Sequence, residues 1–136
     1  MNISELTQDE LSALRDGLAL AAKLVGKTLP LSLEHVQELY DTLRDNKSDF
    51  PEGTIALGLS FGQLIADQSG YDWVRVSDEY GEETCLSPVG AQLICSPISM
   101  MQKRLSNSEV EDLGHLRDET IKIISSKIQS GEYQPR

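Results

Sequence analysis

The sequence of 136 residues contains few cysteines and few histidines, which argues against two common ways of stabilising a small fold. Two cysteines, Cys85 and Cys95, are too few for a disulfide framework. The two histidines, His35 and His115, are far apart in the chain, and no Cys-x-x-Cys pair supplies the spacing of a structural zinc site. We therefore expect free thiols, no metal and no cofactor.

Basic side chains and long apolar runs are also scarce. The chain has 12 Lys and Arg against 22 Asp and Glu, so its formal net charge is −10. Such a chain is repelled by nucleic-acid phosphates and by anionic membrane surfaces, so neither is an expected partner. No apolar run approaches the length of a membrane span, and the acidic first twenty residues are unlike a signal peptide. These features predict a cytoplasmic protein.

What the chain does have is the composition of a globular domain, with 39% hydrophobic and 25% charged residues. Its length fits one domain, 1–136, and is sufficient for a hydrophobic core that needs no disulfide bond or metal ion. We expect a helical pair in residues 1–50, a larger unit in residues 51–130 and a polar tail from 131 to 136.

Helix signals dominate the first half. Thr7-Gln8-Asp9-Glu10 has the form of a capping box, and leucines at helical spacing follow it until Gly26. Ser32 is placed to cap a second helix that ends near Asn46. A third helix, from about 53 to 68, is apolar almost all round and is therefore expected to be central. Its glycines allow close backbone approach, and its one polar stripe is Ser60, Gln63 and Asp67.

After Gly70 the apolar period changes from 3.6 to 2, which indicates strands. The pattern predicts strands near 71–77, 84–86 and 92–96, then a helix from Pro97 to Arg104. A second capping-box pattern, Ser106 to Glu109, is expected to open the last helix. The order ααα-βββ-αα predicts an α+β fold, with helices packed on one face of a three-stranded antiparallel meander.

No residue stands out as catalytic. Neither cysteine adjoins a base in the sequence, and there is no Gly-x-Ser-x-Gly elbow. We therefore assign no catalytic residue and interpret the chain as a binding protein rather than an enzyme.

The acidic charge is unevenly distributed along the chain. Residues 1–83 carry the whole net charge of −10, whereas residues 84–136 hold six basic and six acidic side chains. The densest acidic stretch is 67–83, which favours a basic protein partner. Trp73 is either an anchor for that partner or part of the core under a helix. The candidate partner-binding residues are Asp72, Trp73, Arg75, Asp78, Glu79, Tyr80, Glu82 and Glu83.

Several runs resemble a known bacterial family. They are Ala56-Leu57-Gly58-x-x-x-Gly62, then Tyr71-Asp72-Trp73-Val74-x-Val76-x-Asp78-Glu79-Tyr80-Gly81, then Ser96-Pro97-Ile98-Ser99-Met100 with Lys103-Arg104 and Asp112-Leu113. Together they are similar to the domain of unknown function numbered 3806, over roughly residues 50–125. The family name implies no activity, so no catalytic residue is carried over from it.

Small acidic bacterial proteins of this kind also resemble the immunity proteins encoded beside secreted antibacterial toxins. Those proteins bind and block a cognate toxin, often a nuclease with a basic cleft. By this analogy, we expect the partner to be a basic toxin effector. Two alternatives stay open: a housekeeping or regulatory binding domain with another partner, and an enzyme in which the Ser60, Gln63 and Asp67 stripe converges with the 78–83 turn in a carboxylate-lined cleft.

Overall fold

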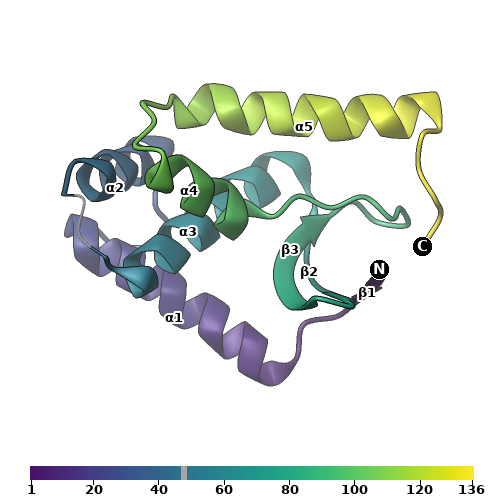
Figure 1. Ribbon diagram of the computed structural model, residues 1–136, viewed down its shortest axis with the longest axis horizontal. Coiled ribbons are helices and arrows are strands. Elements are labelled where there is room, and N and C mark those ends of the chain that lie inside the picture. Colours follow the sequence, from purple (N-terminus) through teal and green to yellow (C-terminus); the bar gives the residue numbers. More distant parts are fainter. Residues whose placement is uncertain (47–48) are drawn as a thin grey trace.

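A computed structural model describes residues 1–46 and 49–136 of the chain (Figure 1). Within these residues, five helices accompany a three-stranded antiparallel sheet, so the predicted α+β class is confirmed. The elements, in chain order, are β1 (Asn2–Ser4), α1 (Gln8–Val25), α2 (Leu33–Asn46), α3 (Pro51–Ser69), β2 (Asp72–Asp78), β3 (Gly81–Ser87), α4 (Pro97–Ser106) and α5 (Leu113–Ser130).

The first two helices begin where their capping signals predict. The Glu10 amide donates to Thr7 Oγ1 at 3.1 Å, and the Thr7 amide donates to Glu10 Oε1 at 2.9 Å, which completes the capping box of α1. At the start of α2, the amide of His35 donates to Ser32 Oγ at 3.2 Å. Both starts depend on residues three apart, so the local sequence is sufficient to set them.

Helix α3 is the central element, as its apolar character predicts. It contacts α1, α2, α4 and α5, and in Figure 1 it crosses the middle of the helical layer. A Cβ built on Gly58 would lie 2.5 Å from Cα of Ile98, and one on Gly62 would overlap the indole ring of Trp73. The two glycines therefore let α4 and β2 approach the helix closely, since any side chain there would occupy space that the neighbours fill.

The sheet has the order β1-β2-β3, and its third strand is not the one that the sequence predicts. Residues 92–96, expected as a strand, make only the isolated bridge between Leu86 and Cys95. Backbone groups of this segment are bonded outside the ladder: the Leu93 carbonyl accepts from the Ser87 hydroxyl at 2.7 Å, and the Gln92 amide donates to the Gln134 carbonyl at 2.7 Å. The edge place is taken by β1, whose Ile3 pairs with Val76.

The two faces of the sheet meet different neighbours. Trp73 and Leu86, which pair across β2 and β3, belong to the main core formed by the helices. Val74, Val76 and Cys85 point to the other face and form a smaller cluster with Ile3 and Ile94. One face of the sheet therefore contacts the helical core, while Ile94 of the loop after β3 packs on the other face.

The last helix begins later than the sequence predicts. Helix α4 continues to Ser106, and α5 starts at Leu113, capped by Asp112. Side chains of α2 form hydrogen bonds with backbone carbonyls that would be bonded within α5 if that helix began earlier. The Tyr40 hydroxyl donates to the Glu109 carbonyl at 2.6 Å, and Gln37 Nε2 donates to the Glu111 carbonyl at 2.8 Å. These tertiary bonds outweigh the local capping pattern.

Candidate functional site

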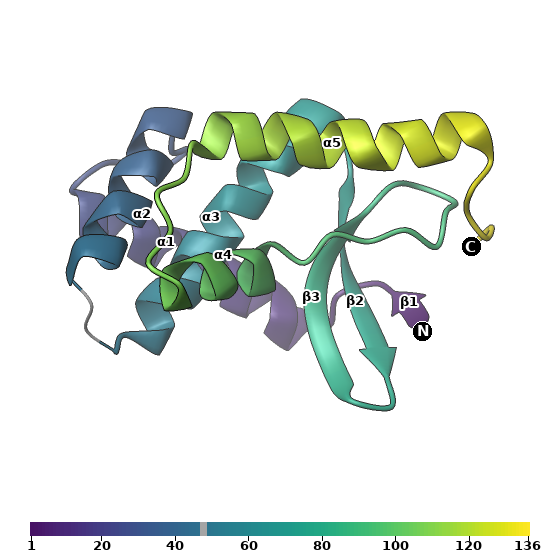
Figure 2. The same ribbon diagram turned by 45° about the horizontal axis from the view of Figure 1, so that its top comes forward.

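The predicted partner-binding residues all lie on the hairpin of β2 and β3, but they do not form one surface. In Figure 2 the closed end of this hairpin extends beyond the helices, while its open end joins the body of the protein. Position along the hairpin therefore decides whether a residue is available to a partner.

Trp73 lies at the open end and belongs to the core. Its side chain is half-buried, its ring packs against Gly62 of α3, and its Nε1 donates to Oε1 of Gln63 at 3.1 Å. The alternative in which Trp73 packs under a helix is confirmed. Asp72, beside it, is exposed, but it lies at the far end of β2 from the turn.

Arg75 lies midway along β2 and is engaged within the protein. Its Nε lies 3.5 Å from Oε1 of Glu10 on α1, and its guanidinium forms an ion pair with Glu82 on β3. The hydrogen bond with Glu82 and the nearby carboxylates raise the pKa of Arg75 above its ordinary value. This side chain ties α1 to the hairpin. Among the described residues, no ion pair involves the other acids of the turn, Asp78, Glu79 and Glu83.

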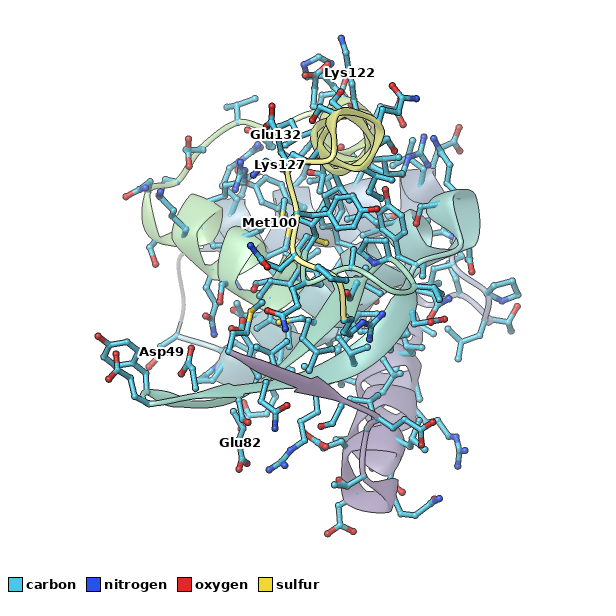
Figure 3. The ribbon with its side chains drawn as sticks, turned by 90° about the vertical axis from the view of Figure 1, so that its right-hand side faces the viewer. Asp49, Glu82, Met100, Lys122, Lys127 and Glu132 are labelled. Carbon is cyan, nitrogen blue, oxygen red and sulfur yellow. The ribbon has the colours of Figure 1, made fainter. Side chains whose placement is uncertain are left out.

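Four residues at the closed end form an exposed surface that we call the hairpin tip: Asp78, Glu79, Tyr80 and Glu82. Tyr80 is 89% exposed, the highest value of any large hydrophobic side chain in the described residues. Asp78 Oδ1 accepts a hydrogen bond from the Tyr80 amide at 2.8 Å, which holds the turn. Figure 3 shows Glu82 extending away from the sheet. The tip is thus an aromatic ring among three exposed carboxylates.

Glu83 does not share this surface, because successive side chains of a strand point to opposite faces. It is half-buried, and its Oε1 accepts a hydrogen bond from the hydroxyl of Ser99 on α4 at 2.7 Å. The sequence placed Glu82 and Glu83 together, whereas the pleat separates them.

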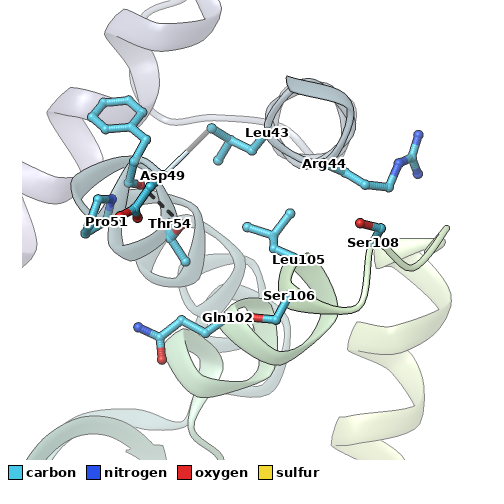
Figure 4. A pocket seen from close by; sticks show the side chains of 10 residues that line it. Leu43, Arg44, Asp49, Pro51, Thr54, Gln102, Leu105, Ser106 and Ser108 are labelled. Carbon is cyan, nitrogen blue, oxygen red and sulfur yellow. Dashed lines mark hydrogen bonds between the residues drawn. The ribbon is translucent and has the colours of Figure 1, made fainter. Parts of the chain in front are cut away.

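A cavity of about 640 Å³ lies between α2, α3 and α4 (Figure 4). Arg44, the basic side chain among the described lining residues, lies 3.4 Å from Asp41 and 3.1 Å from Asp45, so its charge is already balanced. Thr54, also in the lining, donates to the backbone carbonyl of Phe50 at 3.3 Å. Among the described residues, no hydrogen bond joins two of the lining side chains, so no nucleophile is paired with a base there.

Among the described residues, the polar stripe of α3 and the acidic turn line two different cavities. Ser60, Gln63 and Asp67 line a cavity of about 340 Å³ beside α1. The turn lines a separate, shallower one of about 190 Å³ with Met1 and Ile94. Within residues 1–46 and 49–136, no cluster of three or more His, Cys, Asp or Glu is arranged to hold a metal ion.

The two cysteines are free, as the sequence predicts, and both are buried. Burial raises the pKa of the Cys85 thiol to about 11 and that of Cys95 to about 12. A thiol that keeps its proton is a poor nucleophile, so neither cysteine is equipped for covalent catalysis.

Comparison with known proteins places the chain in a family. The model of a domain of unknown function, DUF3806, matches residues 32–115, which is more than half of the chain, so the chain belongs to this family. The match includes α2, α3, the hairpin and α4, and it extends further toward the N-terminus than the resemblance seen in the sequence. No curated protein and no solved structure gives a match. Of the helices in the described parts of the chain, none is both long enough and apolar enough to cross a membrane.

Proposed function

We propose that this DUF3806 protein binds a basic protein partner through the hairpin tip, and that the partner is a toxin effector which it neutralises. The proposal is carried by one observation: Tyr80, 89% exposed, stands among the carboxylates of Asp78, Glu79 and Glu82 at the end of a projecting hairpin. Tyrosine is one of the residue types that most often anchor protein interfaces.

The electrostatics of the tip support a basic partner. No ion pair among the described residues involves Asp78 or Glu79, and the only basic residue of the hairpin, Arg75, is held by Glu10 and Glu82. The tip therefore presents uncompensated negative charge on a chain whose net charge is −10. Such a field speeds the encounter with a positively charged surface.

The shape of the tip supports a cleft as the docking place. The closed end of the hairpin, beside which β1 pairs with β2 as far as Ser77, can enter a concave site that a helical face cannot. Figure 2 shows this end extending beyond the helices. A nuclease toxin keeps its active site in a basic cleft, which is the surface that an acidic projection would block. An immunity protein needs this property and no catalysis of its own.

The first experiment asks whether the tip is the binding surface. The tagged chain is expressed in its native cell, and the proteins that elute with the parent are compared with those captured by Glu79→Lys and by Tyr80→Ala. Glu38→Lys is the matched control, because it makes the same charge change on an exposed position of α2. We expect a partner that the control retains and that both tip variants lose in part.

Kinetics with the captured partner sharpen this test. Glu79→Lys should slow association at low salt and weaken the dependence on salt, whereas Tyr80→Ala should raise the dissociation rate at least about fivefold. Equal rates for the parent and both tip variants would place the interface elsewhere on the protein.

The second experiment asks whether the partner is a toxin. The captured partner is expressed in a susceptible cell with the parent chain, with the double variant Glu79→Lys/Tyr80→Ala, and alone. Growth arrest by the partner alone, relieved by the parent and not by the double variant, is the expected result. A partner that does not impair growth would instead support the alternative of a regulatory binding domain.

A further inference from the structure

The cavity beside α3 has one apolar wall and one polar wall. The apolar wall comes from α1 and from the connection between α1 and α2, and the polar wall is the single polar stripe of α3. Its volume of about 340 Å³ lies at the lower end of the range for small-molecule sites. The lining residues are Leu18, Leu29, Pro30, Leu31, Ser60, Gln63 and Asp67.

The polar wall is fixed in place by hydrogen bonds that its own residues make. Gln63 Oε1 accepts from the Trp73 indole at 3.1 Å, and Gln63 Nε2 donates to Asp67 Oδ1 at 2.8 Å. Ser60 is 3% exposed, and its hydroxyl donates to the Ala56 carbonyl at 2.8 Å. Because α3 is held by the core on its other sides, this wall is preorganised for a ligand.

Counting donors and acceptors shows what the wall still offers. The Ser60 hydroxyl has given its proton to Ala56, so its oxygen can only accept. Asp67 has a second carboxylate oxygen, and no ion pair between described residues includes it. The wall therefore presents acceptors and one negative charge, which favours a cationic donor and disfavours an anion.

The apolar wall favours an apolar group in the part of the ligand beyond its cationic donor. Leu29 is 48% exposed, and Leu18 and Leu31 are half-buried. A short aliphatic chain would cover these side chains and gain free energy from the apolar area removed from water.

From these features we infer that the cavity binds a small primary alkylammonium compound. The ammonium group lies against Asp67, and the alkyl chain lies along Leu18, Leu29 and Leu31. The site is separate from the hairpin tip and does not depend on the function proposed for it. A free molecule fits better than a lysine of a partner protein, because a peptide backbone would have to follow the ammonium group to the rim already occupied by Leu29 and Pro30.

The test is a titration of protein carrying methyl-labelled leucine with hexylammonium, followed by NMR. Asp67→Asn removes the charge but keeps an oxygen for the Gln63 amide, so the polar wall stays assembled. Asp16→Asn, an exposed position of α1 outside the cavity lining, is the matched control. Hexanol and hexanoate replace the ammonium group by a neutral and by an anionic head on the same chain.

We expect saturable shifts of the Leu18, Leu29 and Leu31 methyl signals with hexylammonium, at an affinity that Asp67→Asn weakens about fivefold and Asp16→Asn leaves unchanged. Hexanol should bind more weakly, and hexanoate should cause no shift of these signals.

Three outcomes would overturn the proposal. The first is the absence of saturable shifts at these methyl groups. The second is equal affinity of the parent and Asp67→Asn, which would show that the charge is not recognised. The third is binding of a lysine blocked at its amino and carboxyl groups as tightly as hexylammonium, because the occupant would then be a side chain of a protein.

Discussion

The two ends of the β2–β3 hairpin differ in almost every physical respect, although they belong to the same two strands. At the open end, Trp73 and Leu86 face each other and pack into the helical core. At the closed end, Asp78 and Gly81 face each other, and Tyr80 beside them is 89% exposed. Between them, Arg75 links the hairpin to α1 through Glu10.

The difference shows how one element serves stability and recognition without conflict. The open end fixes the orientation of the hairpin through buried contacts, so its substitution should affect the fold. The closed end makes few contacts with the rest of the protein, so its side chains are free for a partner. Stability and binding are therefore expected to respond to different halves of the hairpin.

The largest expected effect is a difference in stability between substitutions of the two aromatic residues, Trp73 and Tyr80. Trp73→Ala removes a half-buried ring and the hydrogen bond to Gln63, and it should lower the free energy of unfolding by about 3 kcal/mol. Tyr80→Ala should change it by less than about 0.5 kcal/mol, because the ring is exposed. Urea unfolding of both variants measures the contrast. Similar midpoints for the two would mean that the open end does not anchor the hairpin.

A second substitution tests the contact of the hairpin with α3. Gly62→Leu places a side chain where the Trp73 ring and Pro97 already lie, with Cγ of Pro97 2.8 Å from the new Cβ. We expect a loss of about 1–3 kcal/mol in the free energy of unfolding. Ala19→Leu on the exposed face of α1 is the control and should be nearly neutral. An unchanged urea midpoint for Gly62→Leu would contradict the close packing.

The buried thiols at the open end predict a dependence on alkaline pH. The folded state holds the pKa of Cys85 at about 11 and that of Cys95 at about 12, above the unfolded value near 8.5. Unfolding therefore releases protons above about pH 8.5, and stability should fall as the pH rises from there toward the folded pKa values. Below about pH 8.5 the thiols are protonated in both states, so their burial contributes fully to stability.

The measurement is urea unfolding of the parent and of Cys85→Ala/Cys95→Ala from neutral to alkaline pH. The double variant should start less stable and lose less stability as the pH rises. Tyr40, whose pKa is raised by burial, titrates in both proteins, so the difference between the two curves isolates the thiols. Parallel curves would show that the thiols are not protected in the folded protein.

The smallest expected effect is in the middle of the hairpin. Glu82→Gln breaks the ion pair with Arg75 but leaves Glu10 beside the guanidinium, so the free energy of unfolding should fall only slightly. The same variant should weaken binding of a basic partner more than it weakens the fold. Urea unfolding and the association rate at low salt are compared, and a larger effect on stability than on binding would assign Glu82 to the fold alone.

Predictions from the sequence were most accurate where neighbouring residues decide the structure. The capping box of Thr7 and Glu10, the apolar run of α3 and the change of period after Gly70 each predict an element that the structure contains. The candidate site was predicted less well. All eight residues lie on one hairpin, but the pleat turns Glu83 away, Trp73 packs inward, and Arg75 is tied to Glu10 on another element.

Two features depended on contacts that the sequence does not display. Strand β1 has three residues and no periodic signal, and it forms because Ile3 completes the cluster of Val74, Val76 and Cys85. Residues 92–96 have a strand pattern but stay outside the ladder, where the Leu93 carbonyl accepts from the Ser87 hydroxyl and the Gln92 amide donates to the Gln134 carbonyl. In both cases the deciding partner is in another segment of the chain, where local propensity carries no information.

By itself, the sequence determined the α+β class, the family, the boundaries of the first helices and the concentration of acid around the turn, since these follow from composition and from residues three or four apart. The tertiary structure alone decided which end of the hairpin is buried, where α5 begins and which polar groups meet at the α3 cavity. These depend on Gly62 meeting Trp73, Gln37 meeting Glu111, and Leu18 lining the same cavity as Ser60. Such contacts form only when the whole chain has packed, because they join residues that are distant in sequence.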